Sequence, residues 1–162
     1  MVAGGPWSFN NCLLLIHHLR EGENLEDIEF HVADFWVRVH DLPPGFAFET
    51  LARNLGNLMG KFLDYDSGPR RNSMINYMRI QVRLDITEPL MRTKKIRKEG
   101  GTHFEASFSY ERIPLLCYLC GIIGHSDTHC PRLTELPTME LQRGWKEDIR
   151  YEIRTQNRNR PN

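Results

Sequence analysis

Three cysteines and one histidine form the most chemically informative pattern in the chain. They follow the spacing C-x2-C-x4-H-x4-C, and the candidate ligands are Cys117, Cys120, His125 and Cys130. Three thiolates and one imidazole are typical of a closed tetrahedral zinc site, with bonds of about 2.3 Å to sulfur and about 2.0–2.1 Å to nitrogen. Because four protein ligands leave no open position, we expect one structural Zn²⁺ and no catalytic water.

Two other interpretations of this cluster fit the sequence less well. A redox Cys-x-x-Cys pair normally opens a helix, whereas Gly121 and Gly124 discourage a helix and favour a tight loop around an ion. His129 is the competing imidazole, but it would need a gap of eight residues after Cys120. We therefore expect His125 to be the fourth ligand and His129 to face solvent.

Charge is unevenly distributed along the chain. Lys and Arg total 21, as do Asp and Glu, yet residues 1–66 hold 4 basic and 10 acidic side chains (net −6) and residues 67–98 hold 9 and 2 (net +7). The densest basic run contains Arg92, Lys94, Lys95, Arg97 and Lys98. Such a run suits several phosphate contacts or nuclear import. The alternative interpretation is a solvated hairpin arm without a binding role.

Several classes of protein do not fit the sequence. The longest run of aliphatic residues, Leu13 to Ile16, is far shorter than the roughly 18 residues of a membrane-spanning helix, and no leader is recognisable. We therefore expect a soluble, intracellular protein, in the nucleus or the cytoplasm, with no membrane partner. Nucleophile elbows, phosphate-binding loops and open metal positions are absent from the sequence, so we expect neither an enzyme nor a small-molecule substrate.

Hydrophobic periodicity predicts an α+β fold, in which one helix packs on a small, mostly antiparallel sheet. The predicted elements are strands from Phe35 to Leu42, Lys61 to Asp66 and Tyr77 to Ile86, a helix from Phe48 to Gly60, and a hairpin over residues 87–111. A buried strand is expected between Phe9 and Leu19, with Cys12 as a buried apolar side chain. A short C-terminal helix is expected around Trp145, followed by a frayed polar tail.

The two long strands present a second candidate binding surface if they are neighbours. Alternation places one set of side chains on the outward face of both strands: Trp36, Arg38, His40, Tyr77, Arg79, Gln81 and Arg83. Aromatic rings and positive charge together are typical of sheet faces that bind single-stranded nucleic acid. A solvated or tail-covered sheet face is the alternative interpretation.

The cysteine-rich segment resembles a known module. The aromatic Tyr118 after the first cysteine, the G-x-x-G-H core and the flanking Pro114 and Pro131 make it similar to the CCHC zinc knuckle of retroviral and retrotransposon Gag-type proteins. That resemblance implies a single-stranded RNA or DNA partner, with Tyr118 and Ile123 as an apolar platform for an unpaired base. Packing of these two side chains within the protein is the open alternative. No Lys or Arg lies between Cys117 and Cys130, which predicts weak phosphate affinity for the knuckle itself.

A wider resemblance extends over roughly residues 4–131. The motifs that carry it are G-P-W-S-F from Gly5, F-W-V-R-V-H-D-L-P from Phe35, Y-M-R-I from Tyr77 and Y-E-R-I-P from Tyr110. They are similar to a domain of unknown function that precedes a knuckle in plant LINE-type retrotransposon proteins. The resemblance implies that residues 1–30 are the remnant of an upstream RRM-like domain, truncated here, plus an acidic loop.

The expected organisation follows from these patterns. An α+β domain over residues 31–113 precedes the knuckle at 114–131, and residues 132–162 form the short helix and polar tail. The hypothesis is a zinc-dependent protein of retrotransposon Gag-like origin that binds single-stranded nucleic acid. The alternative is a knuckle that docks a protein partner or a second copy of the chain.

Overall fold

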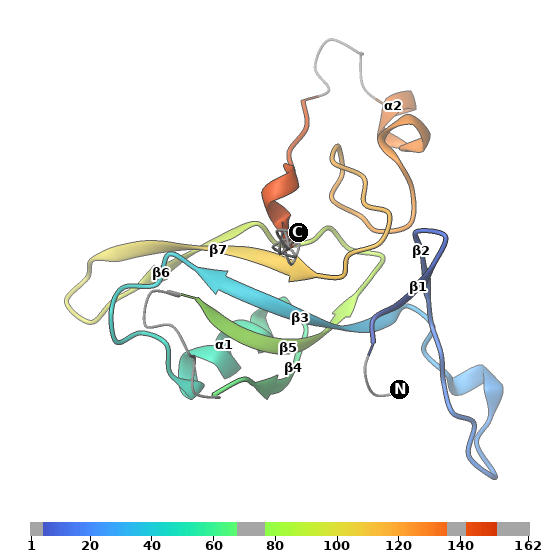
Figure 1. Ribbon diagram of the computed structural model, residues 1–162, viewed down its shortest axis with the longest axis horizontal. Helices are drawn as coiled ribbons and strands as arrows, with labels where there is room; N and C mark the ends of the chain where they lie inside the picture. Colours follow the sequence, from blue (N-terminus) through green and yellow to red (C-terminus); the bar gives the residue numbers. More distant parts are fainter. Residues whose placement is uncertain (1–4, 68–76, 136–141, 152–162) are drawn as a thin grey trace, which may run out of the picture.

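A six-stranded sheet forms the centre of the computed structural model, which describes residues 5–67, 77–135 and 142–151 (Figure 1). The strand order is β4-β5-β3-β7-β6, and β8 pairs with β7. The strands are β3 (Val32–His40), β4 (Lys61–Tyr65), β5 (Met78–Asp85), β6 (Thr93–Arg97), β7 (His103–Glu111) and β8 (Arg150–Tyr151). All pairs are antiparallel except β7 with β8. The predicted mixed α+β class is confirmed.

β3 and β5 are adjacent, as the prediction of a shared outward face assumed. In their register Trp36 lies opposite Gln81 and Arg38 lies opposite Arg79. The alternate side chains point to the other face and are buried, among them Phe35 and Val37 of β3. One face of this strand pair therefore forms the core, while the polar and aromatic set shares the opposite face.

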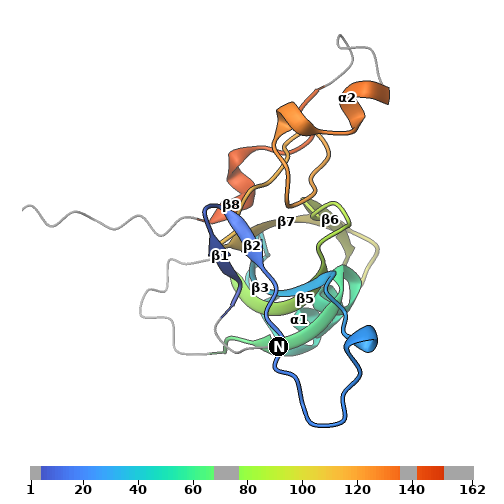
Figure 2. The same ribbon diagram turned by 90° about the vertical axis from the view of Figure 1, so that its right-hand side faces the viewer.

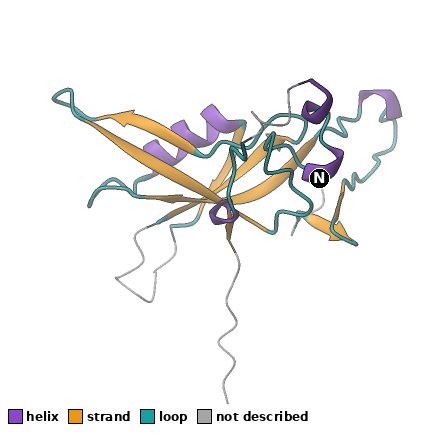
Figure 3. Cartoon of the chain, turned by 90° about the horizontal axis from the view of Figure 1, so that it is seen from above, coloured by secondary structure: helices purple, strands orange, loops and turns teal. Residues whose placement is uncertain are grey.

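The helix α1 (Glu49–Met59) covers the core face of the sheet and packs against β4 and β5 (Figure 2). Its buried residues Ala52 and Leu55 follow the predicted apolar stripe. The helix ends at Gly60, where a Cβ would overlap the carbonyl oxygen of Arg83 in β5. Glycine is therefore required at this close approach of helix end and strand. Figure 3 shows that the other helices are short and that strands make up most of the regular secondary structure.

The predicted hairpin over residues 87–111 is confirmed as β6 and β7. Its turn contains Gly100 and Gly101, both with positive φ. β6 is an edge strand that pairs only with β7 among the described elements, so its second backbone edge faces outward. The basic run of the sequence thus lies on the rim of the sheet.

The expected buried strand near the N-terminus is wrong. That region instead forms an isolated hairpin of β1 (Trp7–Phe9) and β2 (Cys12–Leu14), followed by the 3-10 turn η1 (Leu25–Asp27). Because the two short strands pair only with each other, they have no wider sheet against which to bury both faces. Cys12 is consequently exposed rather than buried.

The predicted C-terminal helix is also wrong within the described residues. After α2 (Arg132–Glu135), residues 142–151 contain only the 3-10 turn η3 (Glu147–Ile149) and β8. β8 joins the sheet beside the end of β7, so backbone pairing replaces the expected helix. The polar tail from Gln156 onward lies outside the described residues. No helix in the described part of the chain is long and apolar enough to cross a membrane.

Candidate functional site

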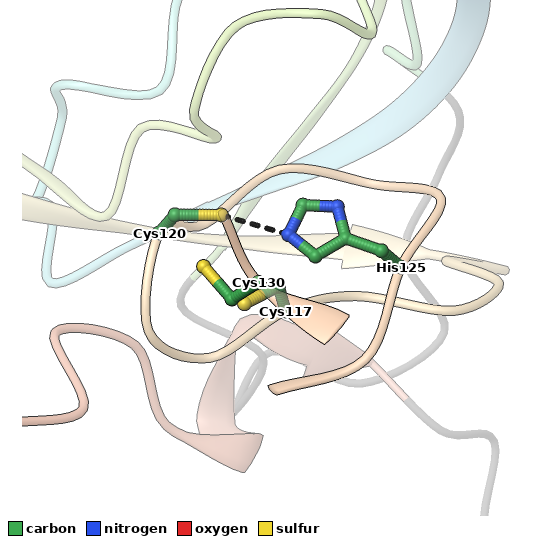
Figure 4. A group of neighbouring side chains, drawn as sticks. All are labelled: Cys117, Cys120, His125 and Cys130. Carbon is green, nitrogen blue, oxygen red and sulfur yellow. Dashed lines mark hydrogen bonds between the residues drawn. The ribbon is translucent and has the colours of Figure 1, made fainter. Parts of the chain in front are cut away.

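The four predicted ligands converge on one point above the end of β7 (Figures 1 and 4). The ligand atoms of Cys117, Cys120, His125 and Cys130 all lie within 4.8 Å of one another, and Cys120 Sγ is 3.3 Å from His125 Nε2. A tetrahedral site with metal–sulfur bonds of about 2.3 Å places its ligand atoms roughly 3.8 Å apart. The cluster therefore fits one zinc ion and needs little rearrangement to close around it.

The knuckle backbone turns tightly to bring the ligands together. The amide of Gly121 donates to the carbonyl of Cys117 (2.8 Å), and the amide of Cys117 donates to the carbonyl of Ile122 (3.1 Å). Gly121 and Gly124 adopt positive φ angles of 77° and 110°, which side chains with a Cβ rarely tolerate. The glycine spacing seen in the sequence is thus explained by the loop geometry.

His129 lies outside the cluster, as expected. It is exposed, and its Nδ1 is within hydrogen-bond distance of the hydroxyls of Ser126 (2.9 Å) and Thr128 (3.1 Å). Asp127 supports the loop from the other side, because its Oδ1 accepts a hydrogen bond from the Tyr118 amide (2.7 Å). The alternative ligand set with His129 does not form in this structure.

The chemistry of the donor set also suits a metal cation. All three cysteines are buried, and burial raises the pKa of the Cys117 thiol to about 12. A thiol in such surroundings stays protonated at neutral pH unless a metal ion stabilises the thiolate. Zinc bound by three thiolates and His125 supplies that charge and holds the loop closed.

The knuckle packs onto the sheet instead of standing apart. Leu116 and Ile123 face each other across a β-bridge and belong to the same apolar core as the strands. The amide of Leu90, just before β6, donates to the carbonyl of Gly121 (2.9 Å). The N-terminal hairpin adds a contact, since the Leu115 amide donates to the carbonyl of Asn11 (2.8 Å).

Trp145 joins the knuckle to the sheet from the C-terminal segment. Its indole Nε1 donates to the carbonyl of Leu90 (2.8 Å), and its backbone amide donates to the carbonyl of Tyr118 (3.1 Å). The ring lies against Gly121, where a Cβ would overlap it. Gly121 therefore serves both the loop conformation and this contact.

Arg150 of β8 makes a second connection between the knuckle and the sheet. It donates to the hydroxyl of Tyr118 (2.7 Å) and to the carbonyls of Ile113 and Pro114. Arg143 adds an ion pair with Asp127 (2.8 Å). Sequence reasoning missed these contacts, because Trp145 and both arginines lie beyond the motif and carry no spacing that points back to it.

These contacts determine the burial of Tyr118 and Ile123, the two residues predicted to form a platform for a base. Ile123 is buried in the sheet core, and Tyr118 is half-buried beside the C-terminal segment. Packing within the protein, which the sequence left open, is the arrangement found. Base stacking by these two residues stays a prediction, and it would require the C-terminal segment to move away from Tyr118.

The outward face of β3 and β5 is assembled as predicted, but its arginines are ion-paired. Glu111 of β7 accepts hydrogen bonds from Arg38 (2.7 Å) and from both Nε and Nη2 of Arg79 (2.9 Å each). Arg83 binds Asp34 through two bonds of 2.7 and 3.0 Å. Burial alone would raise the pKa of Glu111, but its hydrogen bonds and charge interactions with the two arginines outweigh burial and hold that pKa below its ordinary value.

The aromatic residues of this face are stacked with the same arginines. The Arg79 guanidinium carbon lies 3.8 Å from the Trp36 ring centroid, and that of Arg38 lies 4.4 Å from the Tyr77 centroid. The Arg38 guanidinium carbon also lies 3.1 Å from the ring centroid of Tyr151 in β8. His40 is half-buried near Ser109 (2.7 Å), and burial lowers its pKa. The predicted binding role of this face is untested, and its arginines already have carboxylate partners.

The basic run behaves differently. Lys94, Lys95 and Arg97 of β6 are exposed, and they form no ion pair with any residue that the structure describes. At the ends of the run, Arg92 contacts the carbonyl of Gly144 and Lys98 lies 5.3 Å from the ring of Phe46. The free positive charge of this region is therefore concentrated along the sheet edge.

Comparison with known proteins agrees with the metal site. A family model described as a zinc knuckle matches residues 84–132. An uncharacterized protein from Arabidopsis thaliana is 27% identical over 129 residues, which is 78% of this chain and 40% of that protein. The chain thus spans less than half the length of this curated relative. No solved structure matches.

Fold, donor set and family match together define the class of the site. It is a CCHC zinc knuckle, built onto an antiparallel sheet and arranged to bind one Zn²⁺ ion through Cys117, Cys120, His125 and Cys130.

Proposed function

We propose that the protein binds single-stranded nucleic acid, RNA or DNA, through the zinc knuckle and the adjoining edge strand β6, and that it has no enzymatic activity. Zinc knuckles are among the common modules that contact single-stranded RNA. Zinc has a structural role in this proposal, because the site has four protein ligands and no open position.

The observation that carries the proposal is the continuity of the knuckle with the basic edge. The bond from Leu90 to Gly121 fixes the start of the basic run against the knuckle loop, and Arg92 follows two residues later. From there Lys94, Lys95 and Arg97 extend along the outer strand of the sheet. A single strand bound at the knuckle would meet these exposed cations, which compensate for the absence of Lys and Arg within the knuckle itself.

The outward face of β3 and β5 has a secondary role in the proposal. Its aromatic side chains, Trp36 and Tyr77, supply stacking surface, while Arg38, Arg79 and Arg83 hold the face together through carboxylates. Phosphate affinity is therefore expected mainly from β6. Stacking on the open face would extend the binding site but add few ionic contacts.

Titration of the zinc-loaded chain with fluorescent single-stranded RNA and with DNA of the same sequence tests this function. The logarithm of the affinity should fall linearly with the logarithm of salt concentration, with a slope of about −0.7 for each phosphate contact. Zinc content measured on the same sample should equal one ion per chain. One zinc per chain without binding at low salt would reject the nucleic-acid role.

A protein-interaction module is the second candidate, favoured by one specific observation. The C-terminal segment covers Tyr118, the aromatic residue expected to meet a base. In this alternative the knuckle is a structural element that presents a surface to a protein partner or to a second copy. Zinc-dependent self-association in sedimentation experiments, together with no nucleic-acid binding, would support it.

We also propose that the sequence derives from a retrotransposon Gag-like protein of plant LINE type, acting in the nucleus or the cytoplasm. The motifs of the sequence support this origin. Genomic copies that lie beside a reverse-transcriptase reading frame would be the decisive evidence. A fluorescent fusion, with and without the Lys94 to Lys98 cations, would identify the compartment and show whether the basic run acts in nuclear import.

A further inference from the structure

Exposed apolar side chains gather at one end of the molecule. Seven of the nine large apolar residues that the structure leaves exposed lie in the first thirty positions: Trp7, Phe9, Leu14, Ile16, Leu19, Leu25 and Phe30. Phe9 and Leu25 are each 67% exposed. Single exposed apolar residues are ordinary on a protein surface, whereas a gathered set marks an interaction surface.

The N-terminal hairpin and the start of β3 lie at this same end of the molecule (Figure 1). Residues of both line a cleft. Its volume is about 250 Å³. Residues 13–17 line it, as do residues 27–30 with 32–34, and residues 5–7 contribute as well. Arg83 also lines it but is held by Asp34. The cleft therefore offers apolar side chains together with charged ones, between residues 13–17 and the start of β3.

One strand edge beside this cleft has no partner strand in the described part of the chain. β3 pairs with β5 from Val32 to Val39, but with β7 only from Val37 to His40. Among the described strands, none pairs with the second edge of β3 over residues 32–36. An unpaired strand edge presents backbone N–H and C=O groups that recognise another extended chain.

The charge around the cleft determines which kind of polypeptide it attracts. Glu23, Asp27 and Glu29 line it, and Glu23 is partnered by His17. Asp27 and Glu29 form no ion pair with any residue in the described ranges. This acidic rim repels nucleic acid and also repels the same rim of a second copy. It attracts a partner that carries Lys or Arg.

We propose that this cleft binds an extended polypeptide in which apolar side chains alternate with Lys or Arg, added as a strand to the free edge of β3. The apolar side chains would fill the cleft beside Ile16, and the cations would face Asp27 and Glu29. Period-two alternation in the ligand is required because successive side chains of a strand point to opposite sides.

The test uses the full zinc-loaded chain and two fluorescent peptides of equal composition. The alternating peptide has the sequence KVRIKVRIK, and the control VVIIKKRRK groups its apolar residues. Fluorescence anisotropy at physiological salt should show at least tenfold tighter binding of the alternating peptide. Hydrogen exchange of the amides in residues 32–36 should slow when it binds.

Two variants and one matched control locate the peptide. Ile16→Asp should weaken binding at least tenfold by placing a charge in the cleft. The double variant Asp27→Asn, Glu29→Gln should also weaken binding, because it removes the acidic rim while leaving the hydrophobic core unchanged. Leu58→Asp is the control, because Leu58 is similarly exposed (47%, against 43% for Ile16) but lies on α1. Its affinity for the peptide should equal that of the wild type.

Three results would overturn the proposal. Equal affinity for both peptides would mean attraction by charge alone, and no binding of either at 1 mM would exclude this ligand class. A dimer that forms without peptide and disappears in Ile16→Asp would show that a second copy occupies the cleft instead.

Discussion

Two basic surfaces of this protein look alike in sequence and differ in the folded structure. The outward face of β3 and β5 has three arginines, and each is held by a carboxylate. The edge strand β6 has Lys94, Lys95 and Arg97, which have no ion-pair partner among the described residues. Counting cations along the chain therefore does not show where positive charge is available to a ligand.

The position of each strand in the sheet explains the difference. β3 lies between β5 and β7, so carboxylates of neighbouring strands can reach the arginines of the face shared by β3 and β5, and Glu111 of β7 binds Arg38 of β3 and Arg79 of β5. Among the described strands β6 has one neighbour, β7, and the acid nearest in register, Glu105, lies opposite Lys95 without forming an ion pair. Lysine on an edge strand also discourages edge-to-edge association, so these residues help solubility even without a ligand.

Loss of zinc should have the largest effect on nucleic-acid binding, because it removes the knuckle end of the proposed binding surface. Both basic surfaces should stay in place. Cys120→Ser should abolish stoichiometric zinc, since one of four ligands is lost. The circular dichroism of the sheet should be retained, because none of the four ligands lies in one of its strands. Metal analysis and circular dichroism on one sample check both points. Full zinc retention in this variant would refute the assignment of the ligands.

Removal of the Glu111 carboxylate, which Arg38 and Arg79 share, should have the next largest effect, a loss of stability. Glu111→Gln leaves Arg38, whose side chain is 9% exposed, without its charged partner. Breaking such a buried pair should lower the free energy of unfolding by about 3 kcal/mol. Asp34→Asn is the matched control at a more exposed pair and should cost about 1 kcal/mol or less. Urea denaturation measures both, and equal losses would contradict the difference between the two pairs.

Acid should weaken the outward face in a smaller, graded way. The pKa of Glu111 is below its ordinary value of 4.5 in the folded protein, so the unfolded chain binds its proton more readily. The stabilisation by Glu111 is therefore fully present above about pH 4.5 and is lost as pH falls through the folded pKa. The difference in unfolding free energy between wild type and Glu111→Gln should shrink over that range. A difference independent of pH down to 3 would show that the ion pairs contribute nothing.

Neutralising the edge strand should have the smallest effect on stability and a measurable one on binding. The triple variant Lys94→Gln, Lys95→Gln, Arg97→Gln should bind single-stranded RNA roughly tenfold more weakly or worse, with a salt slope shallower by about 2. Its melting temperature should stay close to that of the wild type. Arg83→Gln is the control on the outward face and should leave the salt slope unchanged. If Arg83→Gln lowered the salt slope and the triple variant did not, phosphate binding would lie on β3 and β5 instead.

Local periodicity was sufficient to predict the central elements. The strands β3, β4 and β5, the helix α1 and the β6–β7 hairpin all lie where alternation or three-and-four spacing placed them. The predictions failed at the two ends of the chain. The apolar run near Cys12 resembled a buried strand, and the segment around Trp145 resembled a helix, because short patterns carry no information about which neighbours are present.

The zinc site was determined by the sequence itself, because its four ligands lie within fourteen residues and the glycines between them set the loop. Only the tertiary structure decided what surrounds that site. Trp145 and Arg150 reach Tyr118 from more than twenty-five residues away, and Glu111 reaches Arg38 across the sheet. Contacts of this kind depend on strand order and register, so the sequence predicted the metal while the fold determined which side chains a ligand can reach.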